Sequence, residues 1–443
     1  MLSKKLFGVI SLGCDKNRVD TEKLLAMIKE RGYTLTDDLS KANVVIINTC
    51  AFLQSARAEA IETVIECADY KSGRLEKIVV TGCLPQKFID ELYLPLQEAD
   101  VFLGINDYEK MFDALEQSYQ SGERQNFVGC GADTYHAERV LTTDEHYAYL
   151  KIADGCFNHC TYCLIPKIRG KYRSYPMEKL VEEAKGLGEI TELILVAQDT
   201  TRYGEDIYGE NKFVPLLRQL SSLDNIQSIR LLYCYPEMIT DSLIEEIATN
   251  DKILKYLDIP LQHSENRILK RMGRRGTREE YLALFKKLRE KIDGVAIRST
   301  FISGFPTETE EDFVNMQAFL KQAKLSNCGF FAYSREPDTG AYKMQPQVHH
   351  ATKKRRVKAL YAVQEEISKQ SLLKLVGTKI KVVCDGIDYD KNCFVGRAYF
   401  QAPDIDGKVY FHAHEAMQGE YYTVLVENTD SYDIYGKTED YLL

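Results

Sequence analysis

The sequence predicts an α/β protein in three parts: an N-terminal parallel α/β domain, a partial barrel of six βα units, and a small C-terminal antiparallel β-barrel. Two observations support this fold class. Apolar runs of strand length alternate with helix-like segments as far as residue 371, and short β-rich runs separated by Asp-Gly turns follow from residue 374. The first pattern is typical of parallel sheets covered by helices, and the second is typical of a small barrel.

Length and composition limit the class of protein further. A chain of 443 residues with 44% hydrophobic residues is long enough for two or three domains, each with its own core. No apolar run reaches the roughly 18 residues that span a bilayer, and the first residues lack a signal-peptide pattern, so we expect a cytoplasmic protein that does not bind membranes. Twelve cysteines in a reducing compartment favour metal binding or catalysis over disulfides. The net charge of -9 argues against indiscriminate nucleic-acid binding.

Residues 1–120 contain three strand-like runs that share one feature, a cysteine at the end. The runs are Phe7–Leu12, Asn43–Asn48 and Lys77–Thr81, and the cysteines are Cys14, Cys50 and Cys83. Helix-like sequence follows, from Asp20 in the first case. Because the carboxyl ends of parallel strands meet at one edge, the three thiols should converge. Any one of them alone would more often be a core residue, but three together suggest an iron–sulfur cluster with one open iron.

A second set of cysteines lies in one tight loop within residues 154–169. Cys156, Cys160 and Cys163 have the spacing C-x3-C-x2-C, and the loop directly follows the strand-like run Tyr147–Ala153. A four-iron cluster normally takes four thiolates, so three would leave one iron free to bind a substrate. The alternatives are a structural zinc site or buried thiols, although zinc loops usually pair C-x2-C with a second knuckle.

The loop closely resembles that of the radical S-adenosylmethionine (SAM) enzymes. The resemblance implies that the open iron chelates the amino and carboxylate groups of SAM, and that the reduced cluster cleaves SAM to a 5'-deoxyadenosyl radical. Tyr162 matches the position of an aromatic residue beside the adenine in that family; a plain packing role is as well supported.

Together with the sequences SLGC, NTC and TGC around the first three cysteines, the loop resembles the methylthiotransferase family of radical SAM enzymes. This resemblance implies an auxiliary 4Fe-4S cluster on Cys14, Cys50 and Cys83. The implied cofactors are therefore two 4Fe-4S clusters and SAM. The other six cysteines match no ligand of the family, and we interpret them as structural: Cys67, Cys130, Cys234, Cys328, Cys384 and Cys393.

Residues 142–371 are predicted to form the radical SAM core, a partial (βα)6 barrel like an incomplete TIM barrel. Its expected strands are Tyr147–Ala153, Glu192–Ala197, Ser228–Cys234, Tyr256–Leu261, Val295–Ile302 and Cys328–Tyr333. An eight-fold barrel would need about 250 residues and two more strands.

Polar residues near strand ends are the candidates for binding SAM. Gln198 and Asp199 occupy the place of a Gly-Gly-Glu sequence in many radical SAM enzymes, and this departure leaves their individual roles open. Further candidates are Gln262, His263, Arg298 and Ser299. Arg169 and Arg173 follow the cysteine loop and could bind a carboxylate of SAM or substrate through a planar fork. His263 could equally be a hydrogen-bonded structural residue.

Two basic stretches could bind nucleic acid. The first, residues 270–275, is left open. The second, residues 353–358, lies in a helical pattern, so we favour a solvated helix face.

Residues 374–443 are predicted to form the small β-barrel, which resembles the TRAM domain that ends methylthiotransferases. Its expected strands are Lys379–Cys384, Cys393–Phe400, Lys408–Phe411 and Tyr421–Val426. From Val376 the segment has 6 Lys and Arg against 12 Asp and Glu, a net charge of -6. An RNA-binding barrel needs cations, so we do not expect RNA binding here; an acidic barrel would attract a basic protein. The alternative is that the acidity serves only solubility. Four acids near turns are expected to be exposed: Asp388, Asp390, Asp404 and Asp406.

The segment Ser11–Asp20 looks like the branch of the family that methylthiolates the β-carbon of an aspartate in small ribosomal subunit protein twelve. That basic ribosomal protein, free or within the ribosome, and a low-potential electron donor protein are then the expected partners. One alternative is a tRNA adenosine methylthiotransferase. Another is a non-catalytic iron–sulfur module associated with translation, which would not cleave SAM.

Overall fold

The computed structural model describes residues 5–131 and 135–442. The chain divides into two compact units. Unit 1 comprises Met1–Thr142, Tyr149–His159 and Cys163–Leu187, and unit 2 comprises Thr143–Ala148, Cys160–Tyr162 and Gly188–Leu443. Within the described ranges, no helix combines the length and the apolar character needed to cross a membrane.

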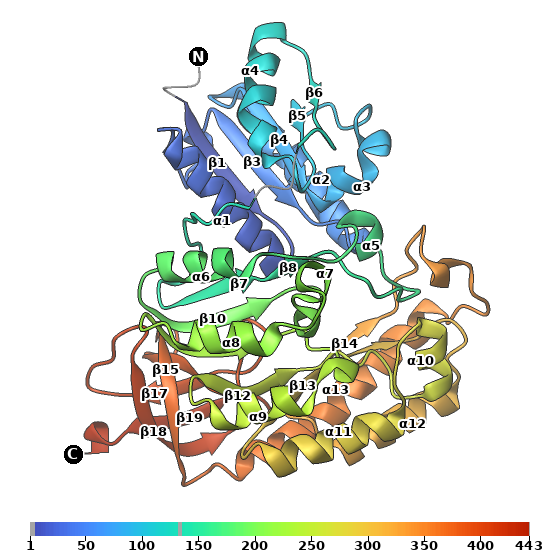
Figure 1. Ribbon diagram of the computed structural model, residues 1–443, viewed down its shortest axis with the longest axis vertical. Coiled ribbons are helices and arrows are strands. Elements are labelled where there is room, and N and C mark those ends of the chain that lie inside the picture. Colours follow the sequence, from blue (N-terminus) through green and yellow to red (C-terminus); the bar gives the residue numbers. More distant parts are fainter. Residues whose placement is uncertain (1–4, 132–134, 443) are drawn as a thin grey trace. The chain divides into compact units, whose positions relative to one another are not determined.

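Unit 1 is built on a six-stranded sheet whose order is β2-β1-β3-β4-β5-β6 (Figure 1). The strands are β1 (Leu6–Ser11), β2 (Thr34–Leu35), β3 (Val44–Thr49), β4 (Lys77–Gly82), β5 (Val101–Phe102) and β6 (Gln125–Asn126). All neighbouring pairs are parallel. This order places a topological switch point between β1 and β3, where ligands of doubly wound sheets bind beyond the carboxyl ends of the strands.

Both faces of this sheet are buried, which explains the continuous apolar runs in the sequence. Val44 and Ile46 lie in the core on one face, and Val45 and Ile47 lie in the core on the other. The first core includes residues of α1 (Asp15–Glu30) and α4 (Met111–Ser121), and the second includes residues of α2 (Gln54–Ala68). α3 (Cys83–Leu92) follows β4 directly. The predicted parallel α/β domain is therefore confirmed, although α1 begins at Asp15, five residues before the expected start.

Unit 1 also contains the segment on either side of the radical loop. Its elements are β8 (Ala153–Asp154), β9 (Arg173–Ser174), α5 (Ile165–Ile168) and α6 (Met177–Gly186). Leu164 and Ile168 are buried in one cluster with Ala51, Cys83 and Leu84. The α5 segment therefore packs beside two of the predicted ligand positions, residues 50 and 83.

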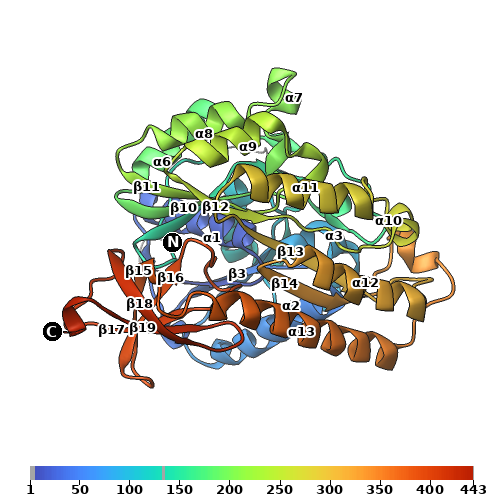
Figure 2. The same ribbon diagram turned by 90° about the horizontal axis from the view of Figure 1, so that it is seen from below.

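The second sheet is the predicted half-barrel, with six strands in the order β14-β13-β12-β11-β10-β7. The five strands from β10 to β14, labelled in Figure 2, pair in parallel. The strands are β7 (Tyr147–Lys151), β10 (Ile190–Val196), β11 (Ile226–Leu231), β12 (Ile253–Asp258), β13 (Ala296–Ser303) and β14 (Asn327–Ala332). All six predicted strands are present, and the sheet stays open because the sequence supplies no further βα units.

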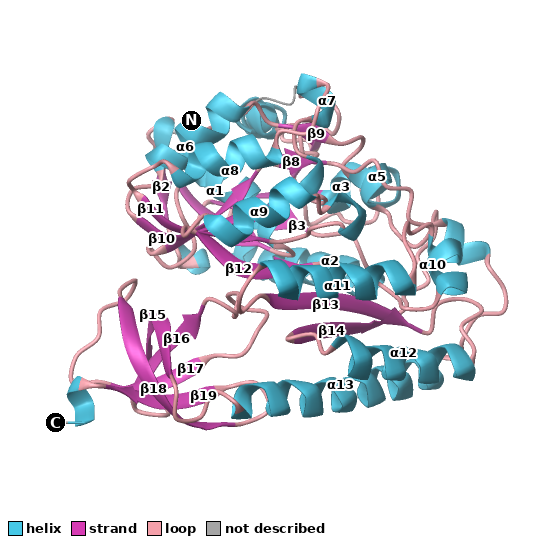
Figure 3. Ribbon diagram, turned by 60° about the horizontal axis from the view of Figure 1, so that its bottom comes forward, coloured by secondary structure: helices cyan, strands magenta, loops and turns pink. Residues whose placement is uncertain are grey.

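Helices connect the strands of the half-barrel. They are α7 (Glu205–Tyr208), α8 (Phe213–Ser221), α9 (Asp241–Thr249), α10 (Asn266–Met272), α11 (Arg278–Lys291) and α12 (Glu310–Ala323). α12 begins with a capping box between Thr309 and Asp312, which satisfies the first amides of the helix. The long helix α13 (His350–Leu373) then leads into the C-terminal barrel (Figure 3).

The C-terminal barrel is closed, in the order β15-β16-β17-β19-β18. Its strands are β15 (Lys379–Asp388), β16 (Cys393–Ala398), β17 (Val409–His412), β18 (Tyr421–Thr429) and β19 (Ile434–Thr438). Four of these strands are predicted by the sequence. β19 is not, because IYGKT is short and contains glycine and lysine, yet it closes the barrel by pairing with β17 and β18.

Buried ion pairs join the C-terminal barrel to the half-barrel within unit 2. Glu192 accepts hydrogen bonds from Arg230 and, at 2.8 Å, from Arg397 of β16. Asp406 accepts a hydrogen bond of 2.7 Å from Tyr256 and lies 3.4 Å from the Arg298 guanidinium. The expectation that Asp406 is exposed is therefore wrong, because its side chain has no exposed surface.

Candidate iron–sulfur and SAM site

The structure places Cys14, Cys50 and Cys83 at the ends of three adjacent strands. Cys14 is the N-cap of α1 after β1, Cys50 follows β3, and Cys83 is the first residue of α3 after β4. A Cβ atom on Gly13 would lie 2.7 Å from Cβ of Cys50 and 3.3 Å from its Sγ, so the turn before Cys14 passes directly over Cys50. Glycine is also required there because φ is +101°.

The three thiols interact electrostatically. Burial raises the pKa of Cys83 to about 12, with further increases from Cys14 and Cys50, while the cation of Arg169 opposes the shift. Burial likewise raises the pKa of Cys50. Cys14 and Cys83 stand at helix N-termini, where the partial positive charge stabilises a thiolate. The raised pKa values of Cys50 and Cys83 mean that a nearby positive charge is needed to hold these two residues as thiolates.

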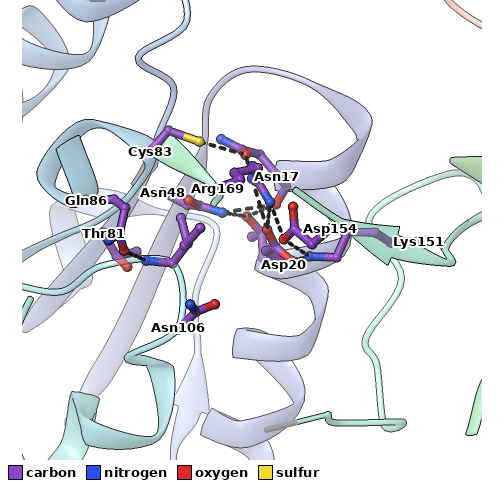
Figure 4. Close-up of polar contacts among 12 residues, drawn as sticks. Asn17, Asp20, Asn48, Thr81, Cys83, Gln86, Asn106, Lys151, Asp154 and Arg169 are labelled. Carbon is purple, nitrogen blue, oxygen red and sulfur yellow. Dashed lines mark hydrogen bonds and ion pairs between the residues drawn. The ribbon is translucent and has the colours of Figure 1, made fainter. Parts of the chain in front are cut away.

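A buried polar network lies beside these cysteines (Figure 4). Asn17 accepts a hydrogen bond from Arg169 and faces Sγ of Cys83 at 3.7 Å. Arg169 donates to Asp154 at 2.7 Å and to Asp20 at 3.3 Å, and both carboxylates also bind Lys151.

Arg169, a candidate for binding a carboxylate of SAM or substrate, is engaged within the protein, and its binding of such a carboxylate stays a prediction. Its side chain is only 2% exposed and its fork is occupied by Asp20 and Asp154 of the protein itself. The neighbouring Asp154 carboxylate outweighs the effect of burial and raises the pKa of Arg169.

The radical loop starts from a turn that only glycine can make. Gly155 has φ +72°, and a Cβ there would lie 2.1 Å from the carbonyl oxygen of Lys171. The amide of Cys156 donates to the carbonyl of Gly170 at 3.2 Å. The amide of Asn158 points at Sγ of Cys156 at 3.3 Å, and that of Ile165 points at Sγ of Cys163 at 3.4 Å. Amide donors of this kind stabilise thiolates that bind a metal.

Unit 2 holds Cys160 and Tyr162. Tyr162 packs, partly buried, against a cluster that contains Met272, Phe305 and Tyr333. Arg274, from the basic stretch 270–275 that the sequence left open, is buried, and its guanidinium lies 4.3 Å from the ring centroid of Tyr235. Burial by itself would lower the pKa of Arg274. The neighbouring Tyr162, Tyr235 and Cys160 outweigh that effect, so the pKa is raised.

The candidate SAM residues after β10 and β12 are partly engaged within the protein. Asp199 is fully buried, accepts from Thr201 at 2.7 Å and pairs with Arg202 at 3.1 Å. Gln198 is half-buried beside it. Gln262 continues β12 through backbone pairing with β13 and has φ +74°. Contact of these residues with SAM remains a prediction.

His263 is completely buried, and its ring is fixed from both sides. The amide of Glu265 donates to Nδ1 at 3.0 Å, and Nε2 lies 3.3 Å from Glu308. Because Nδ1 accepts a hydrogen bond, Nε2 carries the proton and donates to Glu308. This geometry matches the structural role that the sequence left open.

Arg298 and Ser299 lie near the start of β13. Arg298 pairs with Asp258 at 3.0 Å and with Asp406 of the C-terminal barrel. Ser299 donates to the carbonyl of Ile259 at 2.7 Å. Both side chains thus complete internal strand and domain contacts, and their contact with SAM stays a prediction.

Arg173, by contrast, is half-buried and donates to Asn106 at 3.4 Å. Its binding of a carboxylate stays a prediction.

The basic stretch 353–358 is only partly the solvated face that the sequence favoured. Lys353 donates to the carbonyl of Tyr333, and Arg356 binds Glu308 at 2.7 Å; both are buried. Glu308 also accepts from Ser303 and from the amide of Gly304, so it fixes the turn after β13. Helical charge pattern alone could not distinguish these two cations from their exposed neighbours.

The remaining cysteines differ in exposure. Cys67, Cys234 and Cys384 are buried, as a structural role requires. Cys130 is exposed, so burial does not support the structural interpretation for that residue.

The donor set fits iron–sulfur clusters, which take cysteine thiolates as ligands. Across residues 5–131 and 135–442, no three His, Cys, Asp or Glu side chains are close enough to hold one metal ion. A four-iron cluster binds each thiolate on a different iron, so its cysteines stand farther apart. Cys14, Cys50 and Cys83 converge on one sheet edge, and amides point at Sγ of Cys156 and Cys163.

Three families match successive parts of the chain. Residues 6–104 match the family described as Uncharacterized protein family UPF0004, residues 150–320 match the radical SAM superfamily, and residues 376–438 match the TRAM domain. The half-barrel and its cysteine loop thus define a radical SAM enzyme, a class that implies a 4Fe-4S cluster and SAM.

Full-length relatives narrow this class. The chain is 44% identical over 435 residues to the ribosomal protein uS12 methylthiotransferase RimO of Lachnoclostridium phytofermentans, covering 97% of this chain and 99% of that protein. It is 44% identical over 439 residues to RimO of Clostridium tetani, covering 98% of each. The chain belongs to the RimO family of methylthiotransferases.

Solved structures agree at the level of the fold. The radical SAM methyltransferase TsrM from Kitasatospora setae, with cobalamin and a [4Fe-4S] cluster bound, has a TM-score of 0.56 at 14% identity and covers 76% of this chain and 77% of its own. The cobalamin-dependent enzyme OxsB has a TM-score of 0.50 at 13% identity, covering 72% of this chain and 52% of its own.

Proposed function

We propose that this enzyme inserts a methylthio group at the β-carbon of an aspartate of small ribosomal subunit protein uS12, using two 4Fe-4S clusters. One observation carries the proposal: a chain of the RimO family has a complete second set of three cysteines at one sheet edge, in addition to the radical loop. A radical SAM enzyme that only cleaved SAM would not need the second set.

The residues that would hold the cofactors are Cys156, Cys160 and Cys163 for one cluster, and Cys14, Cys50 and Cys83 for the other. Bound there, the clusters supply the electron for reductive cleavage of SAM and the site that holds the sulfur. The chain itself provides amides at Cys156 and Cys163, the helix N-termini at Cys14 and Cys83, and the cation of Arg169. All of these groups stabilise thiolate charge.

The need for a radical follows from the substrate. The C–H bonds at the β-carbon of aspartate are not acidic enough for a general base of ordinary pKa. In the proposed reaction the first SAM takes up one electron and leaves as methionine and 5'-deoxyadenosine, which carries away the hydrogen. A C–S bond to sulfide replaces the C–H bond and returns one electron to the enzyme, and a second SAM methylates the sulfur and leaves as S-adenosylhomocysteine. A low-potential protein must supply the electron.

The C-terminal barrel supports a protein substrate over an RNA. Its net charge of -6 would repel phosphates and attract a basic ribosomal protein. Burial of Asp406 removes one negative charge from the barrel surface, and burial of Arg397 removes one positive charge. The net negative charge of the surface is therefore unchanged. A substrate on the ribosome places the reaction in the cytoplasm.

The direct test is a mass shift. Reconstituted enzyme, reductant, SAM and sulfide are incubated in parallel with small ribosomal subunits and with bulk tRNA, and both products are digested and analysed by mass spectrometry. The proposal predicts one methylthio group on an aspartate of uS12. A methylthio group on a tRNA adenosine instead, or formation of no 5'-deoxyadenosine at all, would contradict it.

A further inference from the structure

The buried network beside Cys83 is more than a structural ion pair, because it touches both ligand-bearing segments of unit 1. Asp20, Lys151, Asp154 and Arg169 are each at most 4% exposed. Two carboxylates and two cations balance one another, so the group is neutral before any thiolate forms.

One end of this network reaches the second cysteine set. The amide nitrogen of Asn17 donates at 3.0 Å to the carbonyls of Leu12 and Thr49, which lie at the ends of β1 and β3. Its oxygen is then free to accept from Arg169 and to face Sγ of Cys83 (Figure 4). Asn17 therefore ties together the three strand ends that carry Cys14, Cys50 and Cys83.

The other end reaches the radical loop. Asp154 accepts from Arg169 with one oxygen, and its second oxygen accepts from the amide of Gly155 at 2.8 Å. Gly155 is followed by Cys156, whose amide donates to Gly170, the residue after Arg169. Arg169 is thus bonded to Asn17, which follows Cys14 and faces Cys83, and to Asp154 on the segment that presents Cys156.

Building on the proposed second cluster, we propose that Arg169 is a positioning residue for the cluster on Cys14, Cys50 and Cys83. Through Asn17 its guanidinium fixes the cysteine-bearing turns, and its charge compensates the thiolates. Thiolate charge would otherwise be added beside a neutral buried network, which is costly above all at the buried Cys83. Partners of metal ligands typically change metal affinity by about 10- to 100-fold when they are removed.

The test isolates this cluster by using the full chain with Cys156, Cys160 and Cys163 replaced by Ala. Arg169→Gln, Arg169→Lys and Arg139→Gln are compared in that background. Arg139 is the matched control, because it is equally buried in unit 1, between Glu22 and Glu183, and no cysteine is among the groups that set its pKa. The measurements are iron per chain, the rate of iron loss to a chelator, and the midpoint reduction potential.

We expect Arg169→Gln to lose iron at least about 10-fold faster. Its midpoint potential should fall, because the more negative reduced cluster loses a nearby cation. Arg169→Lys should keep most of the potential but still lose iron faster, because an ammonium cannot bind Asn17 and Asp154 in one fork. If Arg169→Gln does not fold, the rate of iron loss from Arg169→Lys tests the same positioning role. Arg139→Gln should match the background in iron per chain, in the rate of iron loss and in midpoint potential.

Equal iron loss and potential in folded Arg169→Gln, Arg169→Lys and background protein would overturn the positioning role while leaving the second cluster intact. An equal effect of Arg139→Gln would also overturn it, because buried charge alone would then be the cause. If the background chain holds no iron at all, both the second cluster and this role are refuted.

Discussion

Replacement of Glu192 by Gln should destabilise unit 2 strongly. Glu192 on β10 is 1% exposed and is held between Arg230 of β11 and Arg397 of the C-terminal barrel. A glutamine keeps the shape of the side chain but removes the single negative charge between two buried guanidinium groups. Arg397 also pairs with Asp385 and would keep that partner, so the loss of the Glu192 charge should cost more at Arg230.

The expected magnitude follows from two independent figures. Burial raises the pKa of Glu192, but Arg230 and Arg397 outweigh it and lower the pKa from 4.5 to about 2. This difference corresponds to about 3 kcal/mol of stabilisation at neutral pH. Breaking a buried ion pair by removing one partner typically costs about 3 to 5 kcal/mol. We therefore expect Glu192→Gln to lower the free energy of unfolding by about 3 kcal/mol.

The sign of the pH dependence is fixed by the lowered pKa. The Glu192 contribution is complete well above its unfolded pKa of 4.5 and is lost as the pH falls from there toward 2. The difference between wild type and Glu192→Gln should thus be largest at pH 7 and should shrink below about pH 4.5.

The assay is urea unfolding followed by circular dichroism, since the chain has no tryptophan. Glu189→Gln is the matched control, because Glu189 is exposed just before the same strand and its replacement should change stability by less than about 0.5 kcal/mol. If Glu192→Gln unfolds at the same urea concentration as Glu189→Gln at pH 7, the seam does not stabilise unit 2 and the reasoning fails.

Three further predictions concern the cofactors and the substrate. Replacing Cys156, Cys160 and Cys163 by Ala should leave roughly half the iron and abolish SAM cleavage. Replacing Cys14, Cys50 and Cys83 should keep SAM cleavage but stop sulfur transfer. Loss of all iron from the first variant, while it remains folded, would contradict two separate clusters. Gly155→Ala should lower SAM cleavage by about 100-fold, because its Cβ would clash with the backbone of Lys171. Gly186→Ala should leave SAM cleavage unchanged, because a Cβ at that position meets no other atom. Equal activity of the two variants would refute the clash. Changing the exposed Asp390, Glu415 and Glu420 to Lys should slow uS12 modification more than the same change at the exposed Glu59, Glu62 and Glu66 of α2. Formation of 5'-deoxyadenosine in the absence of substrate should not change. Equal effects of the two sets on uS12 modification would show that the acidic barrel does not select the substrate.

The choice of acids in the last prediction follows from the structure. Asp406 is buried, the Asp388 carboxylate accepts the amide of Lys391 in a turn, and Asp404 has φ +65°, where lysine would be strained. Sequence placed all four acids near turns correctly but could not show which ones the turns use.

Much of the fold could be predicted from the sequence because its strands are buried on both faces. Runs such as residues 44–47, within β3, are continuous and apolar, so a strand buried on both faces of a parallel sheet could be predicted. Short polar strands gave no such signal. β19 has one glycine and one lysine in five residues, and only pairing from both sides makes it a strand.

Sequence was a better guide to the cysteines than to the polar residues around them. The positions of Cys14, Cys50 and Cys83 follow from the ends of regular strands. By contrast, the partners of Arg169 are three residues far along the chain or across a turn: Asn17, Asp20 and Asp154. Arg298 similarly meets Asp406, which is more than a hundred residues away. No local pattern predicts which carboxylate a buried arginine will bind.

The most direct measurement of the central claim follows the hydrogen that the enzyme removes. uS12 is prepared with aspartate deuterated at the β-carbon, assembled into small ribosomal subunits, and incubated with reconstituted enzyme, reductant, SAM and sulfide. The proposed reaction predicts that deuterium appears in 5'-deoxyadenosine in step with the methylthio group on uS12. Methylthiolated uS12 accompanied by 5'-deoxyadenosine without deuterium would contradict radical attack at that carbon.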